Sequence, residues 1–134
     1  MTDAFAVLRN FTREELACPL TGGCAFHPTF PDKLQALRDM YGKPIYPTSC
    51  CRSETYNASL PGASKNSLHI YDNPKRGARG TCAIDIRVTD GVDRHELMKI
   101  ALALSFSAYF ITPDAKYIHL DLRVDLGEQA RFWA

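Results

Sequence analysis

Hydrophobic and polar positions follow two different periods along the chain, which predicts both helices and strands. Between Pro31 and Tyr41 apolar residues recur at three- and four-residue spacing, as on one face of a helix that Gly42 would end. Between Cys82 and Val88 they occupy every second position, which is the pattern of a half-buried strand. We therefore expect a helix that packs on a sheet containing this strand.

Capping residues predict two further helices. Thr12 is followed three positions later by Glu15, the pairing that satisfies free amides at the start of a short helix. We expect Asp93 to cap a second helix from about Arg94 to Ser105, whose apolar stripe would also pack on the sheet.

Short apolar runs and turn residues predict three more strands. One covers residues 45–49, and two others cover 108–112 and 117–123. The turn sequence Pro113-Asp114-Ala115 separates the last two, so we expect them to form a hairpin.

Two segments contain many helix and strand breakers. Cys18–Phe30 and Tyr56–Arg79 are rich in Gly, Pro, Asn or Ser, and we expect loops with little regular structure there. Residues 1–134 are therefore expected to form a single α+β domain, with a small antiparallel sheet packed with helices.

Composition and charge narrow the range of partners. The 134 residues are 46% hydrophobic, enough for one core, and a net charge of +1 predicts no nucleic-acid partner. No apolar stretch reaches the roughly 18 residues of a membrane-spanning helix, and no signal peptide is evident at the N-terminus. We expect synthesis in the cytoplasm, no membrane insertion, and a monomer unless the chain is part of a larger particle.

The five cysteines are expected to be reduced, with at least one free thiol because their number is odd. A disulfide between Cys18 and Cys24 would close a small loop and remains an alternative, whereas a cysteine zinc site lacks two further ligands nearby. Cys50 and Cys51 are neighbours in an extended segment, so they would point in opposite directions and are expected to pack rather than share a metal ion.

Three residues on separate segments could form a metal site. His69, Asp85 and His119 would give zinc three ligands and leave a fourth position for water. Each histidine taken alone could equally be an ordinary hydrogen-bonded residue of the core.

Several short motifs follow one another in a particular order along the chain. They are Phe11–Cys18, Thr48-Ser49 with Arg52-Ser53, Tyr56-Asn57, Ser67-Leu68-His69, Ala83-Ile84-Asp85-Ile86, Ile118-His119-Leu120-Asp121 and Arg131-Phe132-Trp133. Together they resemble the M15 family of zinc D-Ala-D-Ala peptidases, particularly its short bacterial and phage branch, and imply a fold like that of the hedgehog and DD-peptidase proteins.

The resemblance implies roles for individual residues. His69, Asp85 and His119 would bind Zn²⁺, and Arg52 would hold the substrate carboxylate or polarise the scissile carbonyl. Ser67 and Asn57 would orient ligands or substrate, although both residue types are also common hydrogen-bonding residues of loops. Likewise, Arg52 could form only a weak solvated ion pair.

The resemblance also implies a reaction and a setting. The expected reaction is zinc-dependent hydrolysis of peptidoglycan stem peptides, by a D-Ala-D-Ala carboxypeptidase or a murein endopeptidase. A phage lytic enzyme or tail-associated peptidase would reach the cell wall after lysis, holin release or virion delivery, as a monomer or as part of the phage particle.

Two departures from the family pattern affect this interpretation. Lys116 occupies the position where many members have an acidic catalytic base, so Asp121 or Asp114 would have to replace it, and we prefer Asp121. Asp121 could instead orient a ligand or pair with Arg123. The segment from His69 to Asp85 is also longer than in the family and could be a substrate lip or a tolerated loop. Hydrolysis remains the expected function, and these departures support an alternative, a catalytically silent zinc-binding structural or interaction module.

Overall fold

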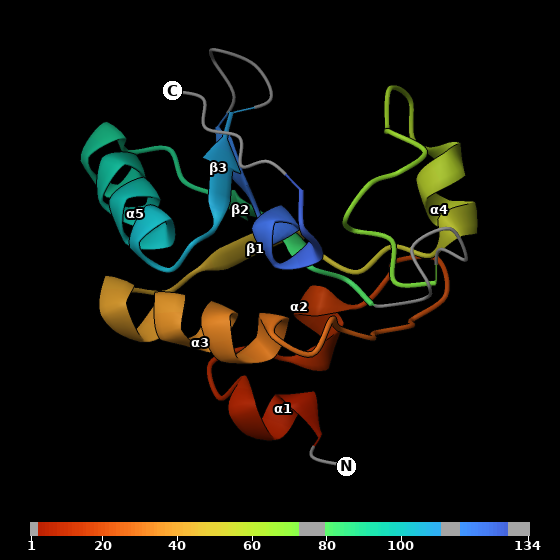
Figure 1. Ribbon diagram of the computed structural model, residues 1–134, viewed down its shortest axis with the longest axis horizontal. Coiled ribbons are helices and arrows are strands. Elements are labelled where there is room, and N and C mark those ends of the chain that lie inside the picture. Colours follow the sequence, from red (N-terminus) through yellow and green to blue (C-terminus); the bar gives the residue numbers. More distant parts are fainter. Residues whose placement is uncertain (1–2, 73–79, 111–115, 129–134) are drawn as a thin grey trace.

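A computed structural model describes residues 3–72, 80–110 and 116–128. Within these ranges the chain forms five α-helices, a short 3-10 helix and a four-stranded antiparallel sheet (Figure 1). The helices are α1 (Ala4–Val7), α2 (Arg13–Leu16), α3 (Phe30–Tyr41), α4 (Glu54–Ser59), α5 (Gly91–Ala103) and η2 (Arg123–Leu126). The strands are β1 (Tyr46–Ser49), β2 (Ala83–Arg87), β3 (Ser107–Tyr109) and β4 (Tyr117–Asp121), in the order β1-β2-β4-β3. The expected α+β class with an antiparallel sheet is confirmed.

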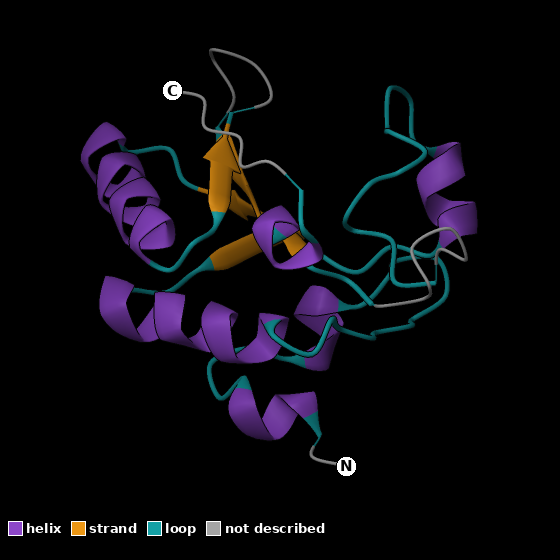
Figure 2. Cartoon of the chain, viewed as in Figure 1, coloured by secondary structure: helices purple, strands orange, loops and turns teal. Residues whose placement is uncertain are grey.

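The central strands of the sheet contribute to the apolar core. Alternate residues of β2 and β4 are large, apolar and buried, and α3 and α5 pack against each other beside the sheet. In Figure 2, α4 lies away from α5, among the loops at the other end of the molecule. The apolar core comprises, among others, Leu34, Leu37, Ile84, Ile86, Leu97, Ile118 and Leu120. Each such side chain contributes about 1.5–3 kcal/mol on burial, which is what holds the strands in a single register.

Helix α2 has the predicted capping box. The Thr12 hydroxyl accepts a hydrogen bond from the Glu15 amide, and the Glu15 carboxylate accepts one from the Thr12 amide. Helix α3 likewise ends where expected, because Gly42 adopts a left-handed conformation with φ 70°.

The predicted start of α5 was wrong. Asp90, not Asp93, caps this helix, since its side chain accepts hydrogen bonds from the amides of Val92 and Asp93. The helix therefore begins at Gly91, a residue whose low helix propensity hid the true start. Asp93 instead forms an ion pair with Lys43.

The expectation of little regular structure from Tyr56 onward was also wrong at its beginning. Helix α4 forms there, with the Ser53 hydroxyl accepting from the Tyr56 amide. Its one buried residue is Asn57, so the helix has no apolar stripe for a periodicity argument to find.

The last two predicted strands pair as a hairpin would. β3 and β4 are antiparallel neighbours, with Tyr109 opposite His119. Strand β4 ends at Asp121, two residues earlier than expected, because Arg123 begins the 3-10 helix. Residues 111–112 of the predicted strand and the predicted turn 113–115 lie outside the described residues.

No helix in the described ranges is both long and apolar enough to cross a membrane.

Candidate metal centre

The structure brings the three metal-ligand candidates together. Asp85 on β2 lies directly opposite His119 on β4, so the antiparallel register places both side chains on one face of the sheet. His69 comes from the loop after α4, and its carbonyl accepts hydrogen bonds from the Arg52 amide at 2.9 Å and the Thr81 hydroxyl at 2.7 Å. The segments that contain Arg52 and Thr81 thereby hold the backbone of His69 beside the strands.

The potential ligand atoms converge on one point. His119 Nδ1 lies 2.8 Å from Asp85 Oδ1, and His69 Nε2 lies 3.3 Å from the same oxygen. One ligand atom from each residue lies within 4.8 Å of the other two, and all three residues are buried. Zinc–ligand bonds of about 2.0–2.1 Å in tetrahedral geometry place neighbouring ligand atoms roughly 3.3 Å apart, so the cluster has suitable dimensions.

Hydrogen bonds fix the opposite nitrogen of each imidazole ring. His69 Nδ1 lies 2.8 Å from the carbonyl oxygen of Cys50, which can only accept, so this nitrogen carries the proton. His119 Nε2 lies 2.7 Å from Asp121 Oδ2, a carboxylate oxygen that accepts in the same way. The remaining nitrogens thus direct lone pairs towards the Asp85 carboxylate, an arrangement that requires a cation between them, either a proton or a metal ion.

The pKa values agree with this account. Burial lowers the pKa of His69, which favours the neutral form that binds metals. Burial would raise the pKa of Asp85, but the adjacent His69 and His119 outweigh it and hold the pKa well below its usual range. Burial would also lower the pKa of His119, but hydrogen bonds to Asp121 and Asp85 raise it instead. In the absence of metal, the raised pKa favours the charged form of His119.

Arg52 is fixed beside this cluster. Its Nη2 lies 3.5 Å from Asp85 Oδ2, on the other oxygen from the one that faces the histidines. Its Nε donates to the Ser49 hydroxyl at 3.0 Å, and its Nη1 donates to Asn57 Oδ1 at 3.2 Å. The buried Asn57 donates in turn to the Ser64 carbonyl at 2.8 Å. Asn57 therefore anchors Arg52 and does not line the cleft described next.

The cluster opens into a cleft of about 490 Å³. Ser67 lines this cleft, and its hydroxyl accepts a hydrogen bond from the His69 amide at 3.2 Å. Arg52 and the three metal-ligand candidates also line it. One hollow thus contains a potential metal site, a guanidinium and a hydroxyl.

Asp121 lies behind the cleft. Its side chain is fully buried, and its two oxygens interact with His119 Nε2 and with three nitrogens of Arg123 at 2.6–3.1 Å. Burial would raise the pKa of Asp121, but the hydrogen bonds from Arg123 and His119 lower it to about 2. Asp121 is therefore an ionised partner of His119 that makes no contact with the cleft.

The cleft is also lined by residues that the sequence did not single out as components of a site, among them Tyr109, Arg123 and Glu128. The Tyr109 ring lies 4.5 Å from the His119 ring, centroid to centroid. The hairpin register could have revealed Tyr109, because it pairs with His119 across β3 and β4. Glu128 follows a turn at Gly127, and no periodic pattern extends to it.

Lys116 and Asp114 were the other residues considered in connection with the catalytic base. Lys116 is exposed just before β4, and its carbonyl accepts from the Val88 amide. Asp114 and residues 73–79, which are part of the longer segment between His69 and Asp85, lie outside the described residues.

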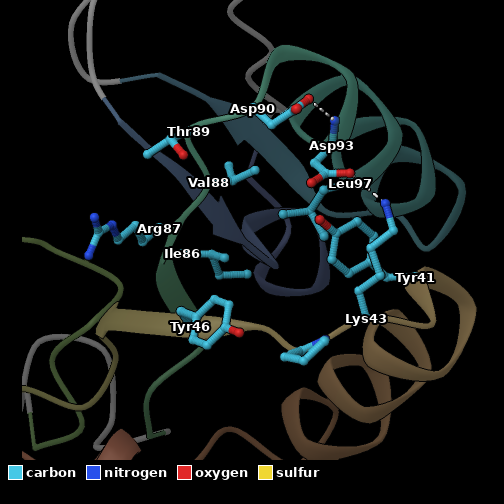
Figure 3. A pocket seen from close by; sticks show the side chains of 11 residues that line it. Tyr41, Lys43, Tyr46, Ile86, Arg87, Val88, Thr89, Asp90, Asp93 and Leu97 are labelled. Atoms are coloured by element: carbon cyan, nitrogen blue, oxygen red, sulfur yellow. Dashed lines mark hydrogen bonds and ion pairs between the residues drawn. The ribbon is translucent and has the colours of Figure 1, made fainter.

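A second pocket, of about 540 Å³, lies between α3, α5 and the end of β2. Figure 3 shows Tyr41, Lys43, Asp93 and Leu97 around it. None of the candidate site residues lines this pocket, whereas Arg52, Ser67 and the three metal-ligand candidates line the cleft.

The fold and the cluster define a small α+β protein whose buried His-Asp-His group could hold a metal ion. A family model described as Peptidase M15 matches residues 9–121, a range that contains all three ligand candidates and Arg52. The chain therefore belongs to the M15 peptidase family. A search of curated proteins gave no match.

Proposed function

We propose that this M15 family member is a zinc peptidase that hydrolyses peptidoglycan stem peptides, with His69, Asp85 and His119 as the zinc ligands. The observation that carries the proposal is the convergence of one atom from each of these residues in a cleft that Arg52 also lines. Zinc bound by two imidazoles and a carboxylate is a Lewis acid that polarises carbonyls and acidifies water.

Arg52 is proposed to bind the substrate. Its hydrogen bonds to Ser49 and Asn57 hold the guanidinium in one orientation, so little conformational entropy is lost when it binds an anion or a carbonyl oxygen. A terminal carboxylate of a stem peptide fits this cation, which supports a D-Ala-D-Ala carboxypeptidase. A murein endopeptidase would instead use Arg52 at the carbonyl of an internal bond.

Ser67 and Tyr109 are proposed to complete the binding site. Ser67 lines the cleft and also supports the His69 backbone, so it can orient substrate and ligand together. Tyr109 covers the His119 ring and gives the substrate an aromatic surface.

Two carboxylates compete for the proton-transfer role. Asp121, the residue favoured from sequence, has both oxygens bonded to His119 and Arg123 and is fully buried. Glu128 lines the cleft. We therefore assign proton transfer to Glu128, and to Asp121 the role of fixing the His119 ring and its protonation.

The proposed setting is lysis of a bacterial cell wall, by a phage lytic enzyme or a tail-associated peptidase. Support for this setting comes from the order of sequence motifs along the chain and from a cleft lined by two arginines, Arg52 and Arg123, which suits the carboxylates of stem peptides.

The deciding experiment uses purified, zinc-loaded protein with intact peptidoglycan and with free stem peptides, analysed by mass spectrometry. Loss of one terminal D-alanine would identify a carboxypeptidase, and cleavage within the stem or cross-link would identify an endopeptidase. His119→Ala is the control, because it removes one ligand.

Zinc content measured on the same samples separates peptidase from binding module. One zinc per chain with no product from any of these substrates would overturn the peptidase assignment and support the silent module that Lys116 suggests. No stoichiometric zinc would overturn the metal site itself.

A further inference from the structure

Two cysteines far apart in the sequence meet beside the site. Cys24 Sγ lies 3.4 Å from Cys51 Sγ, although 27 positions separate the residues. Cys24 is partly exposed and Cys51 is buried, so solvent reaches the pair from the Cys24 side. A disulfide requires an S–S distance of about 2.05 Å, which leaves only a short approach for the Cys24 side chain.

The other cysteines of this region have different partners. The Cys18 thiol donates to the Ser53 hydroxyl at 3.7 Å and accepts from the Ser53 amide at 3.4 Å. The loop that Cys18 and Cys24 flank is already closed by the backbone hydrogen bond from the Cys18 amide to the Gly23 carbonyl. The structure thus favours Cys51 over Cys18 as the partner of Cys24.

We propose that Cys24 and Cys51 form a disulfide bond when the protein meets an oxidising medium. With a small-molecule disulfide such as oxidised glutathione as the oxidant, the Cys24–Cys51 S–S bond forms and the S–S bond of the reagent breaks. The two cysteines lose two electrons and two protons, which leave with the reagent as two free thiols.

The chemistry of the pair suits this exchange. Hydrogen bonds from Cys24 and Cys50 lower the pKa of the Cys51 thiol, whereas the bond to Cys51 raises the pKa of Cys24. The more accessible Cys24 first forms a mixed disulfide with the reagent, and this step is slow because the pKa of Cys24 is raised. The Cys51 thiolate then attacks the Cys24 sulfur and displaces the second reagent thiol. Cys50 is a poor competitor because burial raises the pKa of its thiol.

The bond would fasten the segment that supports the metal centre. Cys51 lies between Cys50, whose carbonyl fixes His69 Nδ1, and Arg52, whose amide donates to the His69 carbonyl. A covalent link from this segment to Cys24 would restrict both residues. It would also reduce the conformational freedom of the unfolded chain, which stabilises the native state.

The test is alkylation of the full chain before and after incubation with oxidised glutathione. Reduced protein should carry an alkyl group on each of its five cysteines after denaturation, and oxidised protein should carry two fewer. Peptide mapping should place the link between Cys24 and Cys51. The Tm should rise by about 10 °C on oxidation, as expected for a loop of this length.

Variants distinguish this bond from other pairings. Cys24→Ser should abolish the loss of alkylation and the rise in Tm, whereas Cys18→Ser and the buried-cysteine control Cys82→Ser should leave both unchanged. Complete alkylation after oxidation, or a mapped link that includes Cys18 or Cys50, would overturn the proposal. These measurements use no substrate, so they are independent of peptidase activity.

Discussion

His119 directs Nε2 at the carboxylate of Asp121, 2.7 Å away, and by this contact presents Nδ1 to Asp85. Because Asp121 is itself paired with Arg123, the ring is held by an ionised group that stays fixed inside the protein. The metal centre therefore depends on a residue that does not reach the cleft.

Asp121→Asn should weaken zinc binding about 10- to 100-fold, the usual effect of removing a carboxylate that supports a ligating histidine. The neutral amide no longer stabilises the proton on His119 Nε2 and leaves Arg123 without its charge partner. Competition with a zinc-binding dye measures the affinity. Unchanged affinity would mean that Asp121 does not position His119.

Glu128→Gln should leave zinc affinity unchanged and lower kcat by about 10²–10⁴-fold, the range expected when a group that transfers a proton is lost. The two carboxylate variants thus separate positioning from proton transfer. If Asp121→Asn lost turnover while it kept zinc, and Glu128→Gln remained active, Asp121 would be the base after all.

Arg52→Lys should reduce kcat/KM by about 10- to 100-fold. The planar guanidinium of Arg52 bonds Ser49 and Asn57 and faces the cleft at the same time, and a lysine ammonium group cannot reproduce this geometry. Asn57→Ala, which removes one anchor of Arg52, should have a smaller effect in the same direction. Kinetics with a free stem peptide and with its C-terminal amide would show whether the loss depends on the substrate carboxylate.

Asp90→Ala should destabilise the protein by about 1 kcal/mol, because the amides of Val92 and Asp93 lose their side-chain acceptor. Asp93→Ala removes only a partly exposed ion pair with Lys43 and should have a much smaller effect. Urea unfolding at constant m-value gives both free energies. A larger loss for Asp93→Ala would contradict the assignment of Asp90 as the cap.

Removal of zinc by a chelator should lower the Tm, since a ligand at 1,000 times its Kd stabilises the native state by about 4 kcal/mol.

Acidification should also release zinc. The raised pKa of His119 means that, as pH falls, protons compete for this ligand at a higher pH than for an ordinary histidine. Zinc release and Tm, both measured from pH 8 to pH 5, test the effect of acidification. Retention of zinc at pH 5 would contradict the expected proton competition at His119.

Local sequence determined much of the fold. The apolar spacing in α3, the capping box of α2 and the alternation in β2 each depend on residues a few positions apart, so they could be read without coordinates. Where the local signal was weak, prediction failed. Gly91 concealed the start of α5, and α4 lacks an apolar stripe.

For the site, the sequence by itself supplied His69, Asp85, His119 and Arg52 as candidates, through residue chemistry and the order of motifs. Only the tertiary structure decided which atoms face one another. Strand register placed Tyr109 on His119, and the return of the chain after β4 brought Glu128 to the cleft. The approach of Cys24 to Cys51 also spans many residues, and such long-range contacts are fixed by packing of the whole core rather than by any local pattern.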